Sequence, residues 1–355
     1  MKDQAREGFL DLSEHTLLPG LVDCHVHLSM SGSGDPSVRQ QQLSACFAGA
    51  KDTIRKHLAC NLCHGVVALR DGGDYGSHVL RYKREFLFEN SGTPELKAAG
   101  KAWHAPGRYG RLVGRTPYRN CSLAQSIVRG QKHADHVKIV NSGLNSLVDF
   151  GKETSPQFSR EDLRKAVLCA HRRGLKVMVH ANGRTPVSDA IDAGCDSIEH
   201  GFFMGRENLK RLAEKQITWV PTAFTMKAYA RLSAKGSRES DGARKNLDHQ
   251  LDQIRQAKDF GVQMAVGTDA GSLGVNHGEA VCEEMRLLLV AGLGLGEAVR
   301  CATSVGAALL GLEDRAGCLM PVSAATFLAV RAEPEKLLDA LSSPERVYVK
   351  GVPIS

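Results

Sequence analysis

The segment LVDCHVHL (residues 21–28) decides the predicted fold, because it places two histidines near the end of an apolar run. Successive side chains of a β-strand point to opposite faces, so the imidazoles of His25 and His27 lie on one face and can bind a single metal ion. Polar residues at the C-terminal end of a buried parallel strand are typical of active sites in (β/α)8 barrels. Two histidines alone recur by chance, so this interpretation needs support from the rest of the chain.

Seven further apolar runs follow, separated by longer amphipathic segments, which is the pattern of a parallel α/β fold. The steps from His25 to Asp269 average about 35 residues per strand, a spacing typical of a (β/α)8 barrel. No G-x-G-x-x-G turn follows an early strand, which disfavours a dinucleotide-binding open sheet. The predicted strands after the first cover residues 66–71, 96–103, 136–140, 175–181, 196–201, 217–222 and 262–270.

We therefore predict an α/β fold in which a (β/α)8 TIM barrel covers residues 21–317. Such a barrel takes about 250 residues, so the chain has room for a small appendage. The segments 1–20 and 318–355 contain short extended pieces, among them TFLAVRA and RVYVKGVP. We expect these two segments to form a small β-layer outside the barrel.

Three later strands end on residues of the types that bind metal ions. His180 closes KVMVH, His200 closes SIEH and Asp269 follows MAVGT, and a small residue comes directly after each. Imidazole and carboxylate groups are the usual ligands of zinc and related divalent ions. These three strands carry ligand-type residues at the same end as the strand with His25 and His27, and packing alone does not explain this repetition. We therefore predict a metal centre at the mouth of the barrel.

Lys138 interrupts the apolar run HVKIV, so its side chain should point opposite to its neighbours and into the barrel. Burial of an unpaired ammonium is unfavourable, so this lysine either pairs with a carboxylate or loses its proton. A neutral amine beside metal ions can take up CO2 and become a carbamate, an anion whose two oxygens can bridge two ions. A structural lysine in an ion pair is the alternative.

Five motifs together resemble the amidohydrolase superfamily: LLPGLVDCHVHL (17–28), HVKIVNSG (136–143), VMVHANG (177–183), SIEHG (197–201) and GTDAG (267–271). They are most similar to the imidazolonepropionase/prolidase-related branch, and residues 275–319 extend the resemblance to nearly the whole chain. The resemblance implies two divalent ions, expected to be zinc, with a hydroxide between them. The first ion would be bound by His25, His27, Asp269 and a CO2-derived carbamate on Lys138, and the second by the same carbamate, His180 and His200.

Three features depart from the pattern of that branch. The 24 residues before His25 are fewer than usual, so we expect a trimmed β-layer or an incomplete N-terminus. Thr326 stands where an acidic residue is common. The loop at residues 104–119 lacks the Gly/His-rich character of prolidase-like members, so the substrate cannot be assigned by analogy.

The resemblance implies that Asp269 takes a proton from the attacking hydroxide and then passes it to the leaving group. We predict a hydrolase that cleaves an amide or peptide-type C–N bond in a dipeptide or an N-acyl amino acid. Asn141 and Asn182 either orient the imidazoles or cap turns. The alternatives are hydrolysis of a lactone, phosphoester or cyclic amide, a deamination, which Lys138 disfavours, or a barrel without activity.

The loop after the third strand also carries Arg108, Arg111 and Arg115, and a guanidinium suits a carboxylate. These arginines indicate a small substrate with a carboxylate, unless they are simply solvated. The predicted substrate-binding residues are His104, Arg108, Tyr109, Arg111, Tyr229 and His277.

Composition limits the partners. The positive residues behind the formal net charge of +7 are scattered and aromatic residues make up 5%, which argues against nucleic-acid binding. No apolar run reaches the roughly 18 residues of a membrane helix and the N-terminus lacks a signal-peptide core, so we expect no membrane partner and a cytoplasmic location.

The CNLCH motif (60–64) matches the motif for covalent haem c attachment. That attachment normally requires export, so we disfavour a haem-binding function. A homo-oligomer is compatible with the sequence.

Overall fold

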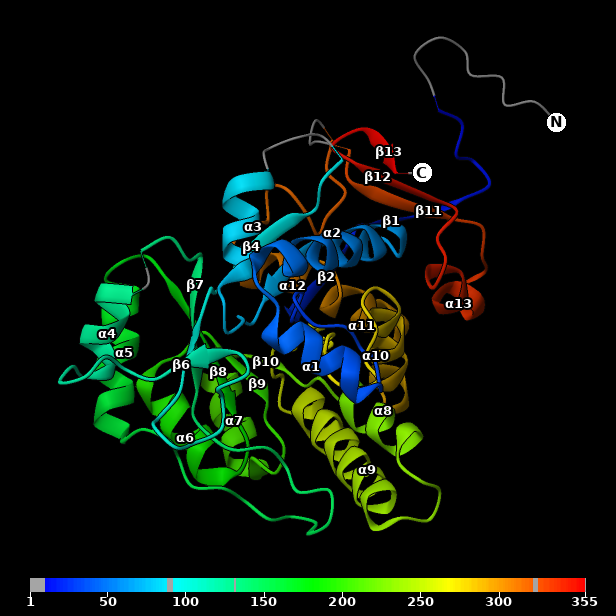
Figure 1. Cartoon of the computed structure of the whole chain (residues 1–355). Helices are drawn as coiled ribbons and strands as arrows, with labels where there is room; N and C mark the ends of the chain where they lie inside the picture. The colour runs from blue at the N-terminus through cyan, green and yellow to red at the C-terminus, as the bar shows by residue number, and fades with distance from the viewer. Residues whose placement is uncertain (1–9, 88–91, 131, 322–324, 355) are drawn as a thin grey trace.

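The computed structural model describes residues 10–87, 92–130, 132–321 and 325–354, and it has parallel strands at its centre with helices around them (Figure 1). A three-stranded sheet has the order β2 (Leu21–Val26), β3 (Val66–Asp71), β4 (Glu95–Ala98). A six-stranded sheet has the order β10 (Thr218–Val220), β9 (Ser197–His200), β8 (Lys176–Ala181), β7 (His136–Val140), β5 (Ala102–Trp103), β6 (Gly114–Arg115).

Two connections close these sheets into a barrel. Asp135, directly before β7, donates its backbone N–H to the last carbonyl of β4 at 3.0 Å. At the opposite edge, residues 262–270 lie between β10 and β2. There the N–H of Ala265 donates to a β10 carbonyl at 3.0 Å, and the carbonyl of Val266 accepts from the N–H of Cys24 at 2.9 Å. The predicted (β/α)8 barrel is confirmed.

Two predicted strands differ from the observed ones. The third, predicted at 96–103, is divided into β4 and β5 because Gly100 has a φ of +73° and turns the chain. The eighth, predicted at 262–270, forms isolated bridges to β10 and β2 and no continuous ladder. Asp269 has a φ of +58°, which lies outside the extended region and ends the strand geometry there.

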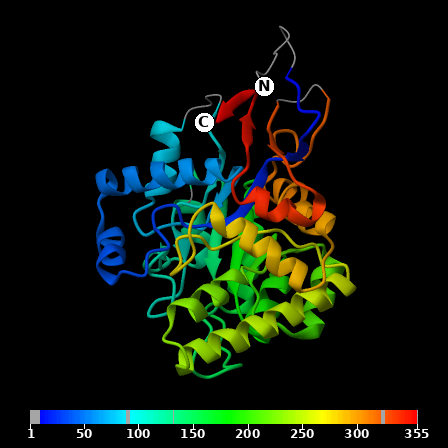
Figure 2. The same cartoon turned by 90° about the vertical axis from the view of Figure 1, so that its right-hand side faces the viewer.

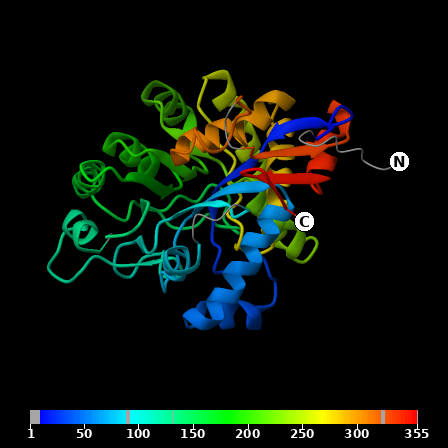
Figure 3. The ribbon, with the colours of Figure 1, turned by 90° about the horizontal axis from the view of Figure 1, so that it is seen from above.

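Helices fill the connections and form a ring around the strands, visible from above in Figure 3. Ser159 caps the N-terminus of helix α5, because its hydroxyl accepts from the N–H of Asp162 at 3.1 Å. The helices of the barrel are α1 (Pro36–Ser44), α2 (Phe47–Cys63), α3 (His78–Phe86), α4 (Leu123–Gly130), α5 (Arg160–His171), α6 (Arg184–Ala193), α7 (Gly205–Lys215), α8 (Phe224–Leu232), α9 (Arg238–Asp259), α10 (Glu279–Val290), α11 (Leu295–Cys301) and α12 (Ser304–Leu310). None of the described helices combines the length and apolar character that crossing a membrane requires.

Segments from both ends of the chain form the predicted small β-layer, seen beside the barrel in Figure 2. Its antiparallel order is β1 (Thr16–Pro19), β11 (Phe327–Val330), β12 (Arg346–Val349), β13 (Val352–Ile354), and η1 (Pro334–Lys336) and α13 (Leu337–Leu341) connect β11 to β12. Leu328 of β11 is fully buried and packs beside Gly65 of the barrel. The domain bounds at 20/21 and 317/318 stay predictions, and residues 1–9, 322–324 and 355 of these segments lie outside the described residues.

Gly267 allows the eighth barrel segment to approach β2 and β10. A Cβ at this position would lie 2.3 Å from a methyl carbon of Val220 and 2.9 Å from Cβ of His25. We expect Gly267→Ala to lower the free energy of unfolding by about 1–3 kcal/mol, because the added methyl overpacks the barrel. Thermal and urea unfolding of the metal-free protein measure this change.

Gly49→Ala is the matched control. Gly49 is exposed in helix α2, and a Cβ there would meet its nearest neighbour at an ordinary 3.6 Å. This substitution should raise the free energy of unfolding by about 0.5–1 kcal/mol, because alanine is the better helix former. Equal effects of the two substitutions would contradict the close approach at Gly267.

Candidate metal centre

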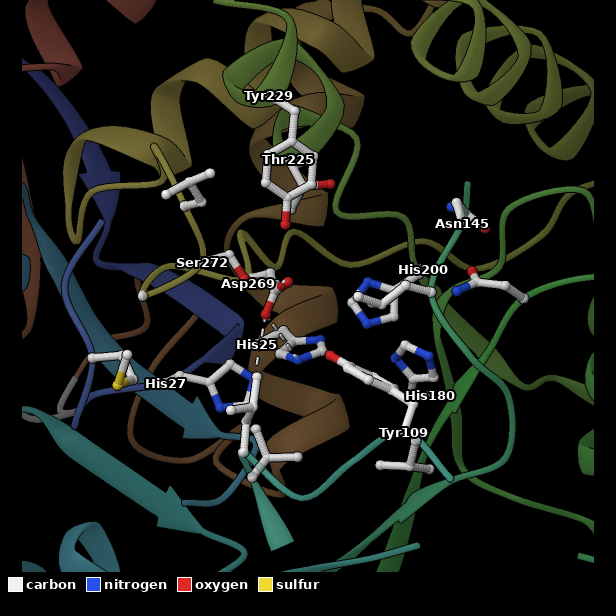
Figure 4. A pocket seen from close by; sticks show the side chains of 18 of the residues that line it. His25, His27, Tyr109, Asn145, His180, His200, Thr225, Tyr229, Asp269 and Ser272 are labelled. Atoms are coloured by element: carbon white, nitrogen blue, oxygen red, sulfur yellow. Dashed lines mark hydrogen bonds and ion pairs between the residues drawn. The ribbon is translucent and has the colours of Figure 1, made fainter. Parts of the chain in front are cut away.

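A cavity of about 290 Å³ lies at the carboxyl ends of the barrel strands. Figure 4 shows His25, His27, His180 and His200 pointing into it together with Asp269. The six residues that the sequence predicts as metal ligands all line this cavity: His25, His27, Lys138, His180, His200 and Asp269. The structure therefore brings together side chains from five parts of the barrel, as the strand-end pattern predicted.

His25, His27 and Asp269 form the tightest group. One oxygen of Asp269, Oδ1, lies 3.5 Å from Nε2 of His25 and 3.3 Å from Nε2 of His27. One potential ligand atom from each of the three residues lies within 4.8 Å of the other two. This donor set of two imidazoles and one carboxylate suits a divalent transition metal.

The second ring nitrogen of each of these histidines has a partner away from the metal group. Nδ1 of His27 lies 2.9 Å from the carbonyl oxygen of Gly73, and Nδ1 of His25 lies 3.0 Å from Oε2 of Glu199. A ring N–H directed to a carbonyl or carboxylate holds the imidazole in one tautomer and leaves the other nitrogen free as a ligand. In both residues Nε2 is the nitrogen that faces Asp269 in the cavity.

His180 and His200 follow the same rule on the other side of the cavity. Nε2 of His180 lies 3.1 Å from the carbonyl oxygen of Gly143, so Nδ1 is free. Nδ1 of His200 lies 2.7 Å from the hydroxyl of Thr222, so Nε2 is free. The two ring centroids are 4.6 Å apart, and the ring of His200 is 5.0 Å from that of His25. The four imidazoles thus form one continuous group.

Lys138 lies on β7, is 2% exposed and lines the same cavity. Its Nζ has no hydrogen-bond partner among the described residues. Burial lowers the pKa of Lys138 to about 8, although the carboxylates of Glu199 and Asp269 act in the opposite direction. An amine in this environment reaches its neutral form far more readily than an exposed lysine.

Asp269 stays ionised in spite of its burial. Burial alone would raise the pKa of its carboxyl group, but His25 and His27 hold that pKa well below its usual range. Its second oxygen, Oδ2, accepts a hydrogen bond from the hydroxyl of Ser272 at 2.8 Å. The carboxylate is therefore oriented from two sides, with Oδ1 directed to the histidines.

Glu199 is a functional residue that the sequence analysis missed. It is fully buried on β9, and Arg70 of β3 reaches it across the barrel interior with Nη2 2.9 Å from Oε1. Arg70 also donates to the hydroxyl of Ser197 at 3.0 Å and to the carbonyl of Cys24 at 2.7 Å. Arg70 and His25 together hold the pKa of Glu199 well below its usual range, against the effect of burial. A carboxylate inside the apolar strand SIEH was the available signal.

Two further buried carboxylates hold the loops that carry the ligands. Asp23 accepts from the N–H groups of His25 and Thr268 at 3.1 and 3.0 Å, and burial raises its pKa to about 7. Asp71 accepts from the N–H groups of Leu28 and Gly73 at 2.9 Å each. These bonds connect β2 to the segments on both of its sides.

Two of the predicted substrate-binding residues line the cavity. The ring of Tyr109 lies 5.4 Å from that of His180. Tyr229 enters from α8, and Figure 4 shows its hydroxyl directed toward Asp269. Burial and the charge of Asp269 raise the pKa of Tyr229 to about 12, so its hydroxyl remains a hydrogen-bond donor.

The other four predicted substrate residues, His104, Arg108, Arg111 and His277, do not line the cavity. Arg111 is exposed, and Arg108 donates to the carbonyl of Ser155 at 2.8 Å. His104 lies with Nδ1 2.9 Å from the carbonyl of Ala105. His277 stacks on His57 with ring centroids 4.1 Å apart. Its backbone carbonyl accepts a hydrogen bond from the thiol of Cys60, a residue of the CNLCH motif in α2. Arg115, in the same loop, lies over the ring of Trp103.

The two asparagines beside the strands hold backbone segments. Asn182 accepts from the N–H of Phe202 at 3.0 Å, and its amide lies 3.4 Å from the Gly143 carbonyl that also faces His180. Asn141 donates to the carbonyl of Pro186 at 3.2 Å. These contacts match the turn-capping alternative, and Asn182 also helps to place the carbonyl that orients His180.

Comparisons with known proteins agree with this geometry. The chain is 27% identical to ochratoxinase from Aspergillus niger over 280 residues, which cover 71% of this chain and 58% of that protein. It is 25% identical to imidazolonepropionase from Porphyromonas gingivalis over 361 residues, which cover 90% of this chain and 75% of that protein. Among solved structures, a Xaa-Pro dipeptidase with bound methionine superposes with a TM-score of 0.81 and 26% identity, over 99% of this chain and 90% of that chain.

The model of the amidohydrolase family matches residues 16–354, which include every metal-ligand candidate. The match, together with these relatives, confirms the predicted hydrolase of amide-type C–N bonds, in a family that typically uses metal ions. Nearly the whole chain takes part in this match. The chain belongs to the amidohydrolase family.

Proposed function

We propose that this enzyme hydrolyses the amide bond of a dipeptide or an N-acyl amino acid with two zinc ions. His25, His27, Asp269 and a carbamate on Lys138 would hold the first ion, and the same carbamate, His180 and His200 the second. One observation carries the proposal: all four histidines line a single cavity, and in each of them one ring nitrogen lies 2.7–3.1 Å from an oxygen of another residue, which leaves the other nitrogen for a metal ion.

Lys138 supports the pair of ions over a single one. Its buried Nζ lacks a hydrogen-bond partner among the described residues, in a cavity that also contains both pairs of histidines. Attack of the neutral amine on CO2 forms an N–C bond and releases one proton, which leaves a carbamate with one negative charge. That anion supplies two oxygens where the lysine alone supplies one nitrogen, so one residue can serve both ions.

The ions, when bound, lower the pKa of a water molecule and polarise the substrate carbonyl. Asp269 is placed to move the proton in this reaction, because its Oδ1 faces the histidines and Ser272 holds its other oxygen. It would accept a proton from the attacking water and donate it to the leaving nitrogen. Tyr229, with its hydroxyl directed toward Asp269, is placed to bind the substrate on the same side.

A substrate panel tests the proposed reaction. The full chain loaded with zinc should release free amine from glycyl-leucine or N-acetyl-leucine, because the site is built to cleave an amide of a small substrate. The panel also contains a lactone, a phosphoester and a cyclic amide, and metal analysis should find close to two equivalents of zinc. Turnover of the lactone or phosphoester alone, or binding of well under one equivalent, would contradict the proposal.

Lys138→Ala should lower kcat/KM by at least about a thousandfold and remove one or both ions, because the bridge between them is lost. Mass spectrometry of metal content and steady-state kinetics measure the two effects. Lys245→Ala, at an exposed position of α9, is the matched control and should keep both properties. Full activity of Lys138→Ala would refute the carbamate bridge.

Glu199→Gln tests the outer partner of His25. The neutral amide leaves Arg70 without its counter-charge and weakens the hold on the His25 ring. We expect zinc affinity to fall about 10–100-fold, measured by competition with a chelator, together with a lower melting temperature of the metal-free protein. Glu214→Gln, at an exposed position of α7, should change neither quantity. Unchanged affinity in Glu199→Gln would show that Glu199 does not support the metal site.

A further inference from the structure

The guanidinium that the sequence analysis expected near the substrate is present, but it comes from another element. Arg39 of helix α1 lines the cavity, whereas Arg108, Arg111 and Arg115 do not. Among the described lining residues, the only cations besides the histidines are Arg39 and Lys138, and Lys138 lies at depth on β7. Arg39 is therefore the positive charge that an incoming substrate meets.

Arg39 is held in place by backbone groups. Its Nη1 donates to the carbonyl of Ser31 at 3.0 Å and to the carbonyl of Gly271 at 3.2 Å. The first carbonyl belongs to the segment that follows His27, and the second lies two residues after Asp269. The guanidinium thus has a set position relative to the metal ligands, although α1 lies outside the barrel strands.

Three of its five N–H donors remain open. Nη1 supplies two hydrogens to the two carbonyls, while Nη2 and Nε have no partner among the described residues. No carboxylate of the described chain forms an ion pair with Arg39. Asp269 is the one carboxylate among the described lining residues, and it faces His25 and His27. A half-buried guanidinium with free donors and no counter-charge suits an anionic ligand.

Two observations place this charge close to the chemistry. Arg39 bonds to the carbonyl of Gly271, two residues after Asp269, and Tyr229 lines the same cavity with its hydroxyl directed toward Asp269 (Figure 4). An anionic group bound between Arg39 and Tyr229 would accept hydrogen bonds from both. The bond to be cleaved would then lie next to Asp269.

Much of the cavity that Arg39 lines is apolar. Leu43 lies one helical turn further along α1, on the same side as Arg39, and also lines the cavity. Leu112 and Leu144 line the cavity while 49% and 55% exposed, so they still have apolar area to bury against a ligand. The other large apolar residues that line the cavity are Met30, Leu147, Phe202, Met226 and Leu273.

We propose that Arg39 binds the free carboxylate of the substrate while the apolar residues of the same cavity bind an apolar side chain. The substrate would then be an N-acyl or N-aminoacyl derivative of a large apolar amino acid such as leucine or phenylalanine. This inference rests on the proposed amide hydrolysis. The planar set of guanidinium donors matches a carboxylate, and the leucines that line the same cavity match the apolar side chain of that amino acid.

Two substrates that differ in one group provide the test. N-acetyl-leucine carries the carboxylate, and N-acetyl-leucinamide replaces it with a neutral amide; release of the α-amine reports cleavage of the acetyl bond in both. The wild type should prefer the acid by about a hundredfold in kcat/KM, which corresponds to a charged hydrogen-bond pair. Arg39→Met should lower kcat/KM for the acid about a hundredfold, mainly through KM, and leave the amide within about twofold.

Controls separate recognition from structure. Arg39→Lys keeps the positive charge but lacks the planar set of guanidinium donors. Compared with Arg39→Met, it should recover part of the preference for the acid. Arg119→Met, at an exposed position outside the cavity, should behave as the wild type. Zinc content and melting temperature are compared for every variant, and the Lys variant decides if the Met variant does not fold. An equal loss on both substrates, or no loss on the acid, would overturn the role of Arg39.

Binding of the product amino acid keeps the test independent of turnover. Calorimetry on the zinc-loaded protein should show leucine binding at least about tenfold more tightly than leucinamide, and Arg39→Met should abolish the difference. If the wild type cleaves neither acetyl compound nor glycyl-leucine but shows this difference, the amide-hydrolase proposal fails while Arg39 remains a carboxylate site. If cleavage occurs without any preference for the acid, the carboxylate site fails while the hydrolase proposal stands.

Discussion

Charges of both signs are buried together inside one closed barrel, and the rest of the site depends on how they are balanced. Arg70 crosses the interior to Glu199, and Glu199 in turn faces His25, so a cation, an anion and a ligand ring form one chain of contacts. Apolar strand residues surround these three side chains and exclude water. A polar group without a hydrogen-bond partner in this interior therefore lowers the free energy of unfolding. Lys138 lacks a hydrogen-bond partner among the described residues in this interior, and it is the residue at which an additional group would complete the balance.

How much could be predicted from the sequence follows from where each residue lies. The H-x-H pair, His180 and Asp269 end apolar runs, and the periodicity of a strand is enough to place them at the barrel mouth. Glu199 was missed because it precedes His200 in the same strand, where alternation assigns neighbours to opposite faces. His200 has a φ of +66°, which turns it back toward the cavity and lets both side chains reach the interior.

Arg39 was missed for a different physical reason. Helix α1 has no fully buried residue, so its sequence resembles a solvated surface helix, and its approach to the cavity depends on carbonyls far away in the chain. Arg108 and Arg111 do not reach the cavity for the same kind of reason: their loop places Tyr109 and Leu112 in the cavity wall and leaves both arginines exposed, with Arg108 bonded to the carbonyl of Ser155. Residues on strands are placed by local periodicity, whereas residues on connecting segments are placed by tertiary contacts that one sequence does not reveal.

The small sheet that joins the two ends of the chain has a consequence for synthesis on the ribosome. Thr16 of β1 pairs with Val330 of β11, a partner that is translated 314 residues later. At about 5–20 residues per second, β1 therefore waits roughly 15–60 s for its neighbour. During that interval the barrel can close through its own strands, because the first barrel strand pairs with β3 and with the eighth segment. The terminal sheet then forms last and joins the two ends of the chain. A nascent chain stalled before β11 would leave the edge of β1 unpaired and open to other strands.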